Sequence, residues 1–172
     1  MPDPTNDIKA ILQELLNNTP NIPATADTRA RINNLLGQKR LVKRPFIHTM
    51  ITPVAGLAGT PVPLACNVPD DFLIQAGTYF ADIGQATQTN STRIVPLATI
   101  NLTIANTSAA FSDAAVPITS LFGTSGDEPF IWPEPQFLPA NTNLAATLTN
   151  FSTAPSTYNI RLMFHGVKLF SQ

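Results

Sequence analysis

The residue types that carry out catalysis are few and scattered in this chain. His48 and His165 are its only histidines, and Cys66 is its only cysteine. A catalytic nucleophile needs a base and an orienting group beside it, and neither histidine has such neighbours in the sequence. Each histidine lies in an alternating strand pattern, which predicts a place on a strand surface or, with its hydrogen bonds satisfied, in the core. We therefore predict no catalytic residue and a protein that is not an enzyme.

Metal ligands are equally sparse. Zinc needs clustered histidine, cysteine or carboxylate, and the sequence has no such cluster. The acidic pairs Asp70 with Asp71 and Asp127 with Glu128 could each contribute to a calcium loop, but acidic pairs at turns usually cap the backbone or stay solvated. Cys66 lies in an apolar run, which is typical of a small buried thiol. We predict no metal and no cofactor.

The one dense group of basic residues is Lys39, Arg40, Lys43 and Arg44. It ends a basic segment, because residues 1–44 hold seven basic and four acidic side chains, whereas residues 45–172 hold three and seven. Such a run favours an acidic protein surface or a nucleic acid as partner, or it keeps a solvated strand edge from pairing. The interleaved aromatic residues of single-strand binders are missing, so nucleic acid is the weakest of these three interpretations.

Residues 128–139 (EPFIWPEPQFLP) form a stiff aromatic segment around Trp132, the only tryptophan. Its structural role would be to cap one end of a hydrophobic core. Its functional role would be to anchor the chain in a neighbouring subunit, because aromatic rings bury a large area at small entropic cost. Both roles stay open from the sequence.

Two amphipathic helices are predicted at the N-terminus. Residues 7–17 place apolar side chains on one helical face, and a second helix runs from Asp27 to Gly37. Helices of this size need a surface to pack on, which is the body of the protein, the other helix or a partner. The apolar face of the first helix consists of Ile8, Ile11, Leu12, Leu15 and Leu16.

The chain from residue 45 onward has the pattern of an all-β domain. Short β-branched or aromatic runs alternate with turn clusters at spacings of about ten to fifteen residues. The last two runs alternate in polarity, and we expect them to pair edge to edge through a turn and to bury one apolar face against a second sheet. Strands are predicted at residues 46–51, 62–67, 72–76, 92–95, 100–105, 116–118, 130–132, 143–150 and 158–169. The predicted fold is an antiparallel β-sandwich, jelly-roll-like, over residues 45–172, with a short N-terminal α-helical arm over residues 1–44.

Composition bears on the cellular setting. The first residues lack the positive segment and apolar stretch of a secretion signal, and no run of about 18 apolar residues is present. We therefore expect synthesis in the cytoplasm and no membrane association. Charged residues make up 12% of the chain, about half the usual quarter, so the surface should be polar but largely uncharged.

Three segments together resemble a known class of proteins. Residues 138–170, with residues 44–51 (RPFIHTMI) and 69–74 (PDDFLI), are similar to the small β-sandwich virion proteins of tailed bacteriophages, which decorate or cement the head or sit at its vertices and collar. The resemblance spans roughly residues 44–172 and brings no catalytic residues with it. It implies a non-enzymatic virion component, made in the host bacterial cytoplasm, that binds itself as a homo-oligomer and a major capsid or other virion protein.

Under this hypothesis, apolar and basic residues of the arm and the aromatic segment make the assembly contacts. The candidates are Ile8, Ile11, Leu12, Leu15, Leu16, Lys39, Arg40, Lys43, Arg44 and Trp132. The alternative hypothesis is a lectin-like or receptor-binding module at a fibre or vertex. Its candidate glycan contacts are Trp132, Tyr79, Asp82 and Gln85.

Overall fold

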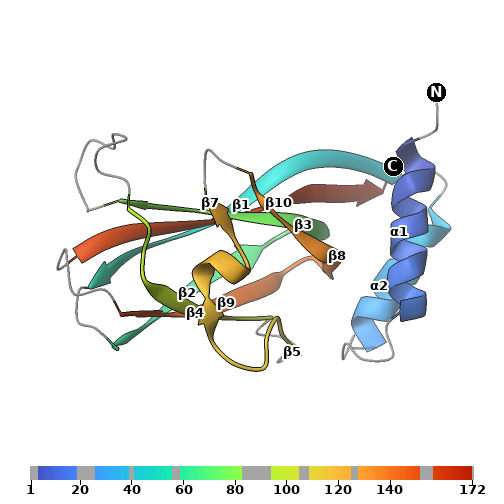
Figure 1. Cartoon of the computed structure of the whole chain (residues 1–172). Coiled ribbons are helices and arrows are strands. Elements are labelled where there is room, and N and C mark those ends of the chain that lie inside the picture. The colour runs from blue at the N-terminus through green and yellow to red at the C-terminus, as the bar shows by residue number, and fades with distance from the viewer. Residues whose placement is uncertain are drawn as a thin grey trace.

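The computed structural model describes residues 4–18, 26–38, 41–55, 59–82, 94–104, 109–124, 128–151 and 157–171. Two helices come first, and the described strands follow (Figure 1). The helices are α1 (Pro4–Asn18) and α2 (Ala26–Gly37). The strands are β1 (Leu41–Ala55), β2 (Pro61–Val68), β3 (Phe72–Asp82), β4 (Ala98–Ile104), β5 (Ala109–Ala110), β6 (Val116–Pro117), β7 (Gly123–Thr124), β8 (Phe130–Leu138), β9 (Thr142–Asn150) and β10 (Thr157–Ser171), with a 3-10 turn, η1 (Ile118–Ser120), after β6.

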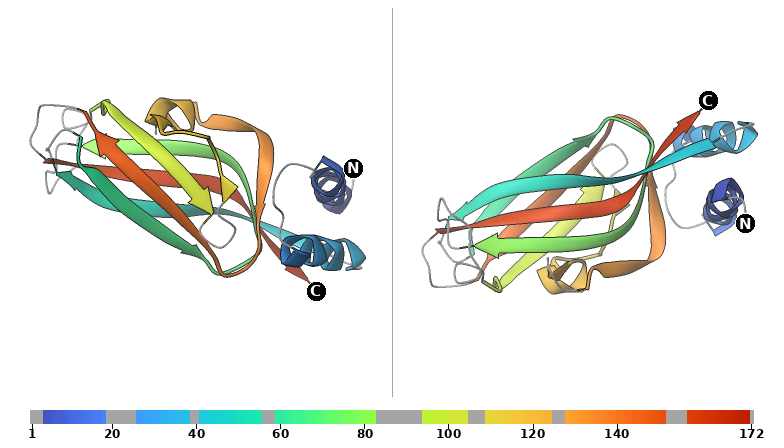
Figure 2. Two further views of the ribbon diagram at one scale, coloured as in Figure 1. Left: turned by 90° about the horizontal axis from the view of Figure 1, so that it is seen from below. Right: turned by 90° about the horizontal axis from the view of Figure 1, so that it is seen from above.

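The strands form two sheets. Sheet A has the order β1-β10-β3, and both β7 and β8 pair with the far side of β3. Sheet B has the order β2-β9-β4, and both β5 and β6 pair with the far side of β4. The pairs are antiparallel except for the short parallel contact between β3 and β7. The two views of Figure 2 look onto one sheet each and show the second sheet behind it.

The main hydrophobic core fills the space between the sheets. Alternation along the strands puts Leu162 and Phe164 of β10 on the inner face of sheet A, and Leu144 and Leu148 of β9 on the inner face of sheet B. All four side chains are fully buried. The coarse prediction of a mostly β chain with two sheets and two short N-terminal helices is confirmed.

The helices lie across one end of the sheets rather than between them (Figure 1). They build a second, smaller core, in which one face of each helix meets the ends of β1, β3, β8 and β10. Its buried members are Ile8, Leu12, Ile32, Leu35, Leu41, Leu73, Phe137 and Leu169. The predicted helical spacing therefore identified the buried face of α1 correctly.

Three strand predictions need correction. The last two strands do not pair with each other, because β9 lies between β2 and β4 in sheet B and β10 lies between β1 and β3 in sheet A. Of the strand predicted at residues 92–95, residues 94–95 are described and are not a strand, and residues 92–93 lie outside the described part. The strand β1 begins at Leu41, so residues 41–44 belong to a sheet rather than to the arm.

Candidate functional site

The apolar face of α1 is occupied within the chain. Ile8 and Leu12 are 5% and 0% exposed, and they lie in the same cluster as Leu73 and Leu169 of sheet A. The other three predicted contact residues, Ile11, Leu15 and Leu16, are half-buried around this cluster. Contacts between copies through this face stay a prediction, and they would require the arm to leave its own sheet.

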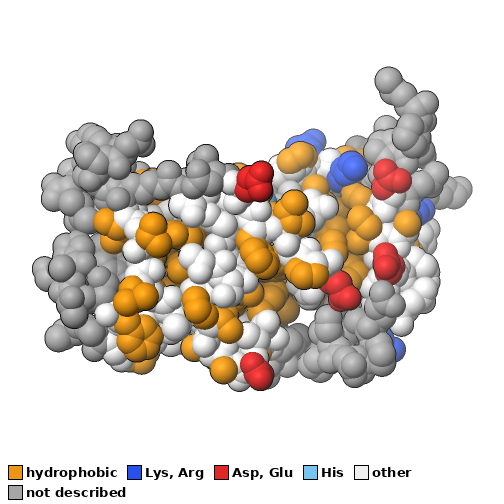
Figure 3. All heavy atoms as spheres, in the orientation of Figure 1, with side chains coloured by type: hydrophobic (Ala, Val, Ile, Leu, Met, Phe, Trp, Pro, Cys, Tyr) orange, Lys and Arg blue, Asp and Glu red, His pale blue; other side chains and the backbone are white. Residues whose placement is uncertain are grey.

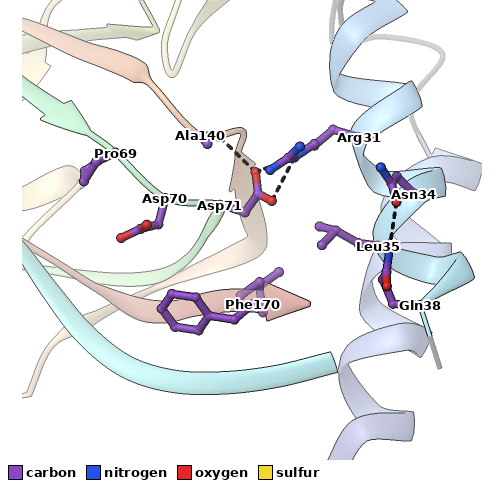
Figure 4. A pocket seen from close by; sticks show the side chains of 10 residues that line it. Arg31, Asn34, Leu35, Gln38, Pro69, Asp70, Asp71, Ala140 and Phe170 are labelled. Atoms are coloured by element: carbon purple, nitrogen blue, oxygen red, sulfur yellow. Dashed lines mark hydrogen bonds and ion pairs between the residues drawn. The ribbon is translucent and has the colours of Figure 1, made fainter. Parts of the chain in front are cut away.

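An ion pair fixes α2 to the body at the same end. The Arg31 Nε donates to both carboxylate oxygens of Asp71, at 2.9 and 3.1 Å. The Asp71 side chain is 4% exposed and also accepts a hydrogen bond from the backbone N–H of Ala140 at 2.9 Å. Figure 4 shows the two side chains pointing toward one another from α2 and from the turn before β3. They line a cleft of about 330 Å³ between the helix and the sheet.

The neighbouring acidic residue is engaged as well. The Lys168 Nζ lies 2.8 Å from Asp70 Oδ2 and 3.7 Å from the centre of the Phe46 ring. Both carboxylates of the Asp70–Asp71 pair therefore contact cationic side chains of the chain itself. The Asp70–Asp71 pair joins the arm and the last strand to the β2–β3 turn, which is a structural use that the sequence did not predict.

His48 of β1 lies in an aromatic environment. Its ring centre is 4.8 Å from that of Phe46 and 4.7 Å from that of Phe72, and the side chain is 7% exposed. Its Nε2 is buried and has no hydrogen-bond partner among the described residues, so the prediction of a satisfied core histidine is wrong on this point. Burial, followed by the nearby Lys168 charge, lowers the pKa of His48 below its usual value and keeps the ring neutral.

His165 lies on the opposite face of the same sheet. In the β1–β10 register, His48 is paired with Phe164 and His165 with Ile47, so the two histidines point away from each other and share no site. The His165 Nε2 is 2.8 Å from the Thr78 hydroxyl, and burial lowers the pKa of His165. This agrees with the predicted place on a strand surface.

The described part of the basic run lies on an edge strand. Lys43 and Arg44 are exposed on β1, the outermost strand of sheet A, and the Arg44 guanidinium lies 5.7 Å from the centre of the Phe170 ring. Lys39 and Arg40 lie outside the described residues. This location is expected if the basic residues keep a solvated strand edge from pairing. Binding of the basic residues to an acidic partner stays a prediction.

Trp132 caps the core, as one of its two predicted roles requires. It is 5% exposed, its ring packs against Phe111 and Phe164, and its Nε1 donates to the Leu121 carbonyl at 2.9 Å. A groove of about 420 Å³ runs beside it. Hydrophobic side chains are widespread on the side of the molecule shown in Figure 3. The groove is lined by Phe111, Ser120, Leu121, Phe130, Trp132, Pro133, Glu134 and Gln136.

The proposed glycan contacts are poorly placed for that role. Tyr79 and Asp82 are 1% and 0% exposed, so neither presents its side chain to solvent, and Gln85 lies outside the described residues. Cys66 is half-buried at the edge of the main core. Burial raises the pKa of its thiol, which disfavours the nucleophilic thiolate.

The outer face of sheet A carries an apolar surface that the sequence did not single out. Ile47 and Ile51 on β1 and Ile131 on β8 are 48%, 63% and 73% exposed. Strand register places Ile47, His165, Ala76 and Ile131 in one row across the sheet. The alternation of β1 could have revealed this surface, because residues 47, 49 and 51 share a face.

The described residues hold neither a metal cluster nor a membrane-spanning helix. Among them, no three histidine, cysteine or acidic side chains are grouped so that they could hold a metal ion. Neither described helix is long and apolar enough to cross a membrane.

No protein-family model, no curated protein and no solved structure matches the chain.

Proposed function

We propose that this protein is a non-enzymatic structural component of a bacteriophage virion, with a jelly-roll fold, which decorates or cements the particle by binding the capsid and its own copies. Under this proposal the chain is made in the bacterial cytoplasm and resides in the virion. The proposal extends the resemblance of residues 44–172 to phage virion proteins, and it assigns no chemical reaction to the chain.

The order in which the strands pair is the observation that carries the proposal. The first strand pairs with the last, β2 with β9, β3 with β8, and β4 with β5 and β6. Each of these pairs lies inside the previous one along the chain, as in one long hairpin. The further pairs β3–β10 and β4–β9 join the arms of this hairpin into two sheets, as expected if the hairpin is rolled up. Double-sheet jelly rolls occur in viral capsid proteins and in lectins. The buried positions of Tyr79, Asp82 and Trp132 favour the first of these two classes.

The outer face of sheet A is the surface that we assign to the capsid. Ile47, Ile51 and Ile131 expose large apolar side chains on this face, and exposed apolar surface is a common feature of protein–protein interaction sites. Lys43 lies on the same face of β1 by strand alternation. A partner with an apolar centre and an acidic rim would complement this surface.

The test uses particles of the phage whose genome encodes the chain. Particles washed at high salt should contain the protein in a fixed ratio to the major capsid protein by quantitative mass spectrometry. Added back to particles that lack it, the wild-type chain and a Gln13→Lys control, altered on the exposed side of α1, should bind, whereas Ile51→Lys should not. Absence of the protein from washed particles refutes the virion role, and binding by Ile51→Lys refutes the assigned face.

A further inference from the structure

We infer that the outer face of sheet B binds the same face of a second copy of this chain. The inference rests on the proposed function only in that the function calls for copies that bind one another. It is tested without any particle. It also concerns a different surface from the one assigned to the capsid.

The first argument is that sheet B contains no charged residue. The strands β2 (PVPLACNV), β4 (ATINLTI) and β9 (TNLAATLTN), with the short β5 (AA) and β6 (VP), are free of aspartate, glutamate, lysine and arginine. Soluble proteins normally intersperse charges over their surfaces. A sheet with no charged side chain is unusual even in a chain of which only 12% of the residues are charged.

The second argument concerns the shape and chemistry of the face. The strand register sets Pro63, Thr147 and Asn101 in one row across the sheet, and the rows on either side hold Thr99, Thr149 and Pro61, and Thr103, Ala145 and Ala65. All of these side chains are small, so two such faces can approach closely. The side-chain oxygen of Asn101 is buried, but threonine hydroxyls both donate and accept hydrogen bonds. Each exposed hydroxyl can therefore pair with its own kind across a two-fold axis, where the same patch serves both subunits.

One end of the face is apolar. Leu97 and Phe151 lie side by side where β4 begins and β9 ends, because the Phe151 N–H donates to the Leu97 carbonyl at 2.8 Å. They are 67% and 49% exposed, and the nearby Val95 is 76% exposed. These side chains supply the hydrophobic contact that the polar rows lack.

A second copy is the occupant that these features favour. A charged partner would lose hydration on binding here and would gain no opposite charge. Other described surfaces carry ions, such as Lys43 and Arg161 on sheet A and Glu14 and Arg31 on the helices. Face-to-face packing of two sheets B is therefore a pairing in which no ion must be desolvated.

The face is also uncovered, and its area is that of a weak dimer interface. None of the described elements lies over sheet B in the left view of Figure 2, where the helices stand off its end. The strands β2, β9 and β4 with the short β5 and β6 hold 28 residues, so standard strand spacings of about 3.4 Å and 4.8 Å give a face of about 450 Å². Two copies would bury about 900 Å², the size of a weak and reversible interface.

The experiment compares two matched substitutions by light scattering across a range of protein concentrations. Thr147 is exposed at the centre of sheet B, and Thr49 is exposed on the outer face of sheet A. The wild-type protein and Thr49→Lys should have twice the 18.5 kDa mass of the chain. Thr147→Lys places two like charges in the interface and should raise the dissociation constant at least about 100-fold. Circular dichroism and thermal unfolding check that both variants fold.

Each outcome decides the matter. A wild-type monomer at every concentration, or a folded Thr147→Lys that stays dimeric, overturns the inference, and so does a Thr49→Lys that dissociates equally. None of these results bears on whether the protein is found in phage particles. Conversely, a dimer that Thr147→Lys alone dissociates supports the inference even if the chain is absent from particles.

Discussion

Removal of Arg31 should destabilise the protein more than removal of its partner Asp71, although the two form one ion pair. The reason is their unequal burial, because the Asp71 side chain is 4% exposed and that of Arg31 is 48% exposed. In Arg31→Met, the buried carboxylate keeps one hydrogen bond from the described residues, donated by the Ala140 backbone. In Asp71→Asn, the freed guanidinium returns to water, and the amide oxygen can still accept that hydrogen bond.

The magnitudes follow from these exposures. Breaking a fully buried pair costs about 3–5 kcal/mol, and the half-exposed Arg31 reduces this to about 2 kcal/mol for Arg31→Met. Asp71→Asn should cost about 1 kcal/mol, near the upper value for exposed pairs. The double variant should also lose about 1 kcal/mol, so that adding Asp71→Asn to Arg31→Met restores stability. For a chain of this size, the Tm of Arg31→Met should fall by about 4–8 °C.

Urea unfolding of the four proteins tests this prediction with two signals. The fluorescence of the buried Trp132 reports on the sheets, and circular dichroism at the helical minimum reports on the arm. Coincident transitions justify a single free energy of unfolding for each variant. A double variant that is less stable than Arg31→Met, or single variants with equal losses, would refute the reasoning.

Three further predictions concern stability. Leu12→Ala, in the fully buried centre of the second core, should lower the free energy of unfolding by about 2–4 kcal/mol in urea titration. Gly166→Ala should lower the Tm sharply in calorimetry, because a Cβ there would collide with the backbone carbonyl of Leu73, whereas Gly37→Ala has open space and should be nearly neutral. His48 has a folded-state pKa below its usual 6.5, so the unfolded chain binds its proton more readily; its contribution is fully present above pH 6.5 and falls as the pH drops below it. His48→Phe should therefore flatten the loss of stability that begins as the pH falls below about 6.5, as measured by urea titrations.

Sequence periodicity predicted single elements well and their partners poorly. The spacing of apolar residues located both helices, and the alternation in residues 143–150 located β9 almost to the residue. Alternation states which side chains share a face, but it does not state which strand lies alongside. For that reason the last two strands were expected to pair with each other, whereas they lie in opposite sheets.

The candidate site shows the same limit. The Arg31–Asp71 pair joins residues 40 positions apart, and nothing in the local sequence of either residue marks the other. Asp70 and Asp71 look like a solvated turn until the fold places Lys168 and Arg31 beside them. The absence of charge from sheet B could be read directly from the sequence, yet its meaning depends on knowing that those strands form one sheet.

The pairing of the first strand with the last has a consequence for synthesis. Leu41 pairs with Ser171 at one end of the register and Ala55 with Thr157 at the other, and β10 also supplies the partner of β3. Sheet A therefore lacks the strand between β1 and β3 until translation has passed residue 171. The nascent chain must keep β1 and β3 apart from other strands until then, and folding dominated by such distant contacts is slow. A product that stops before residue 157 would leave two long strand edges open to aggregation.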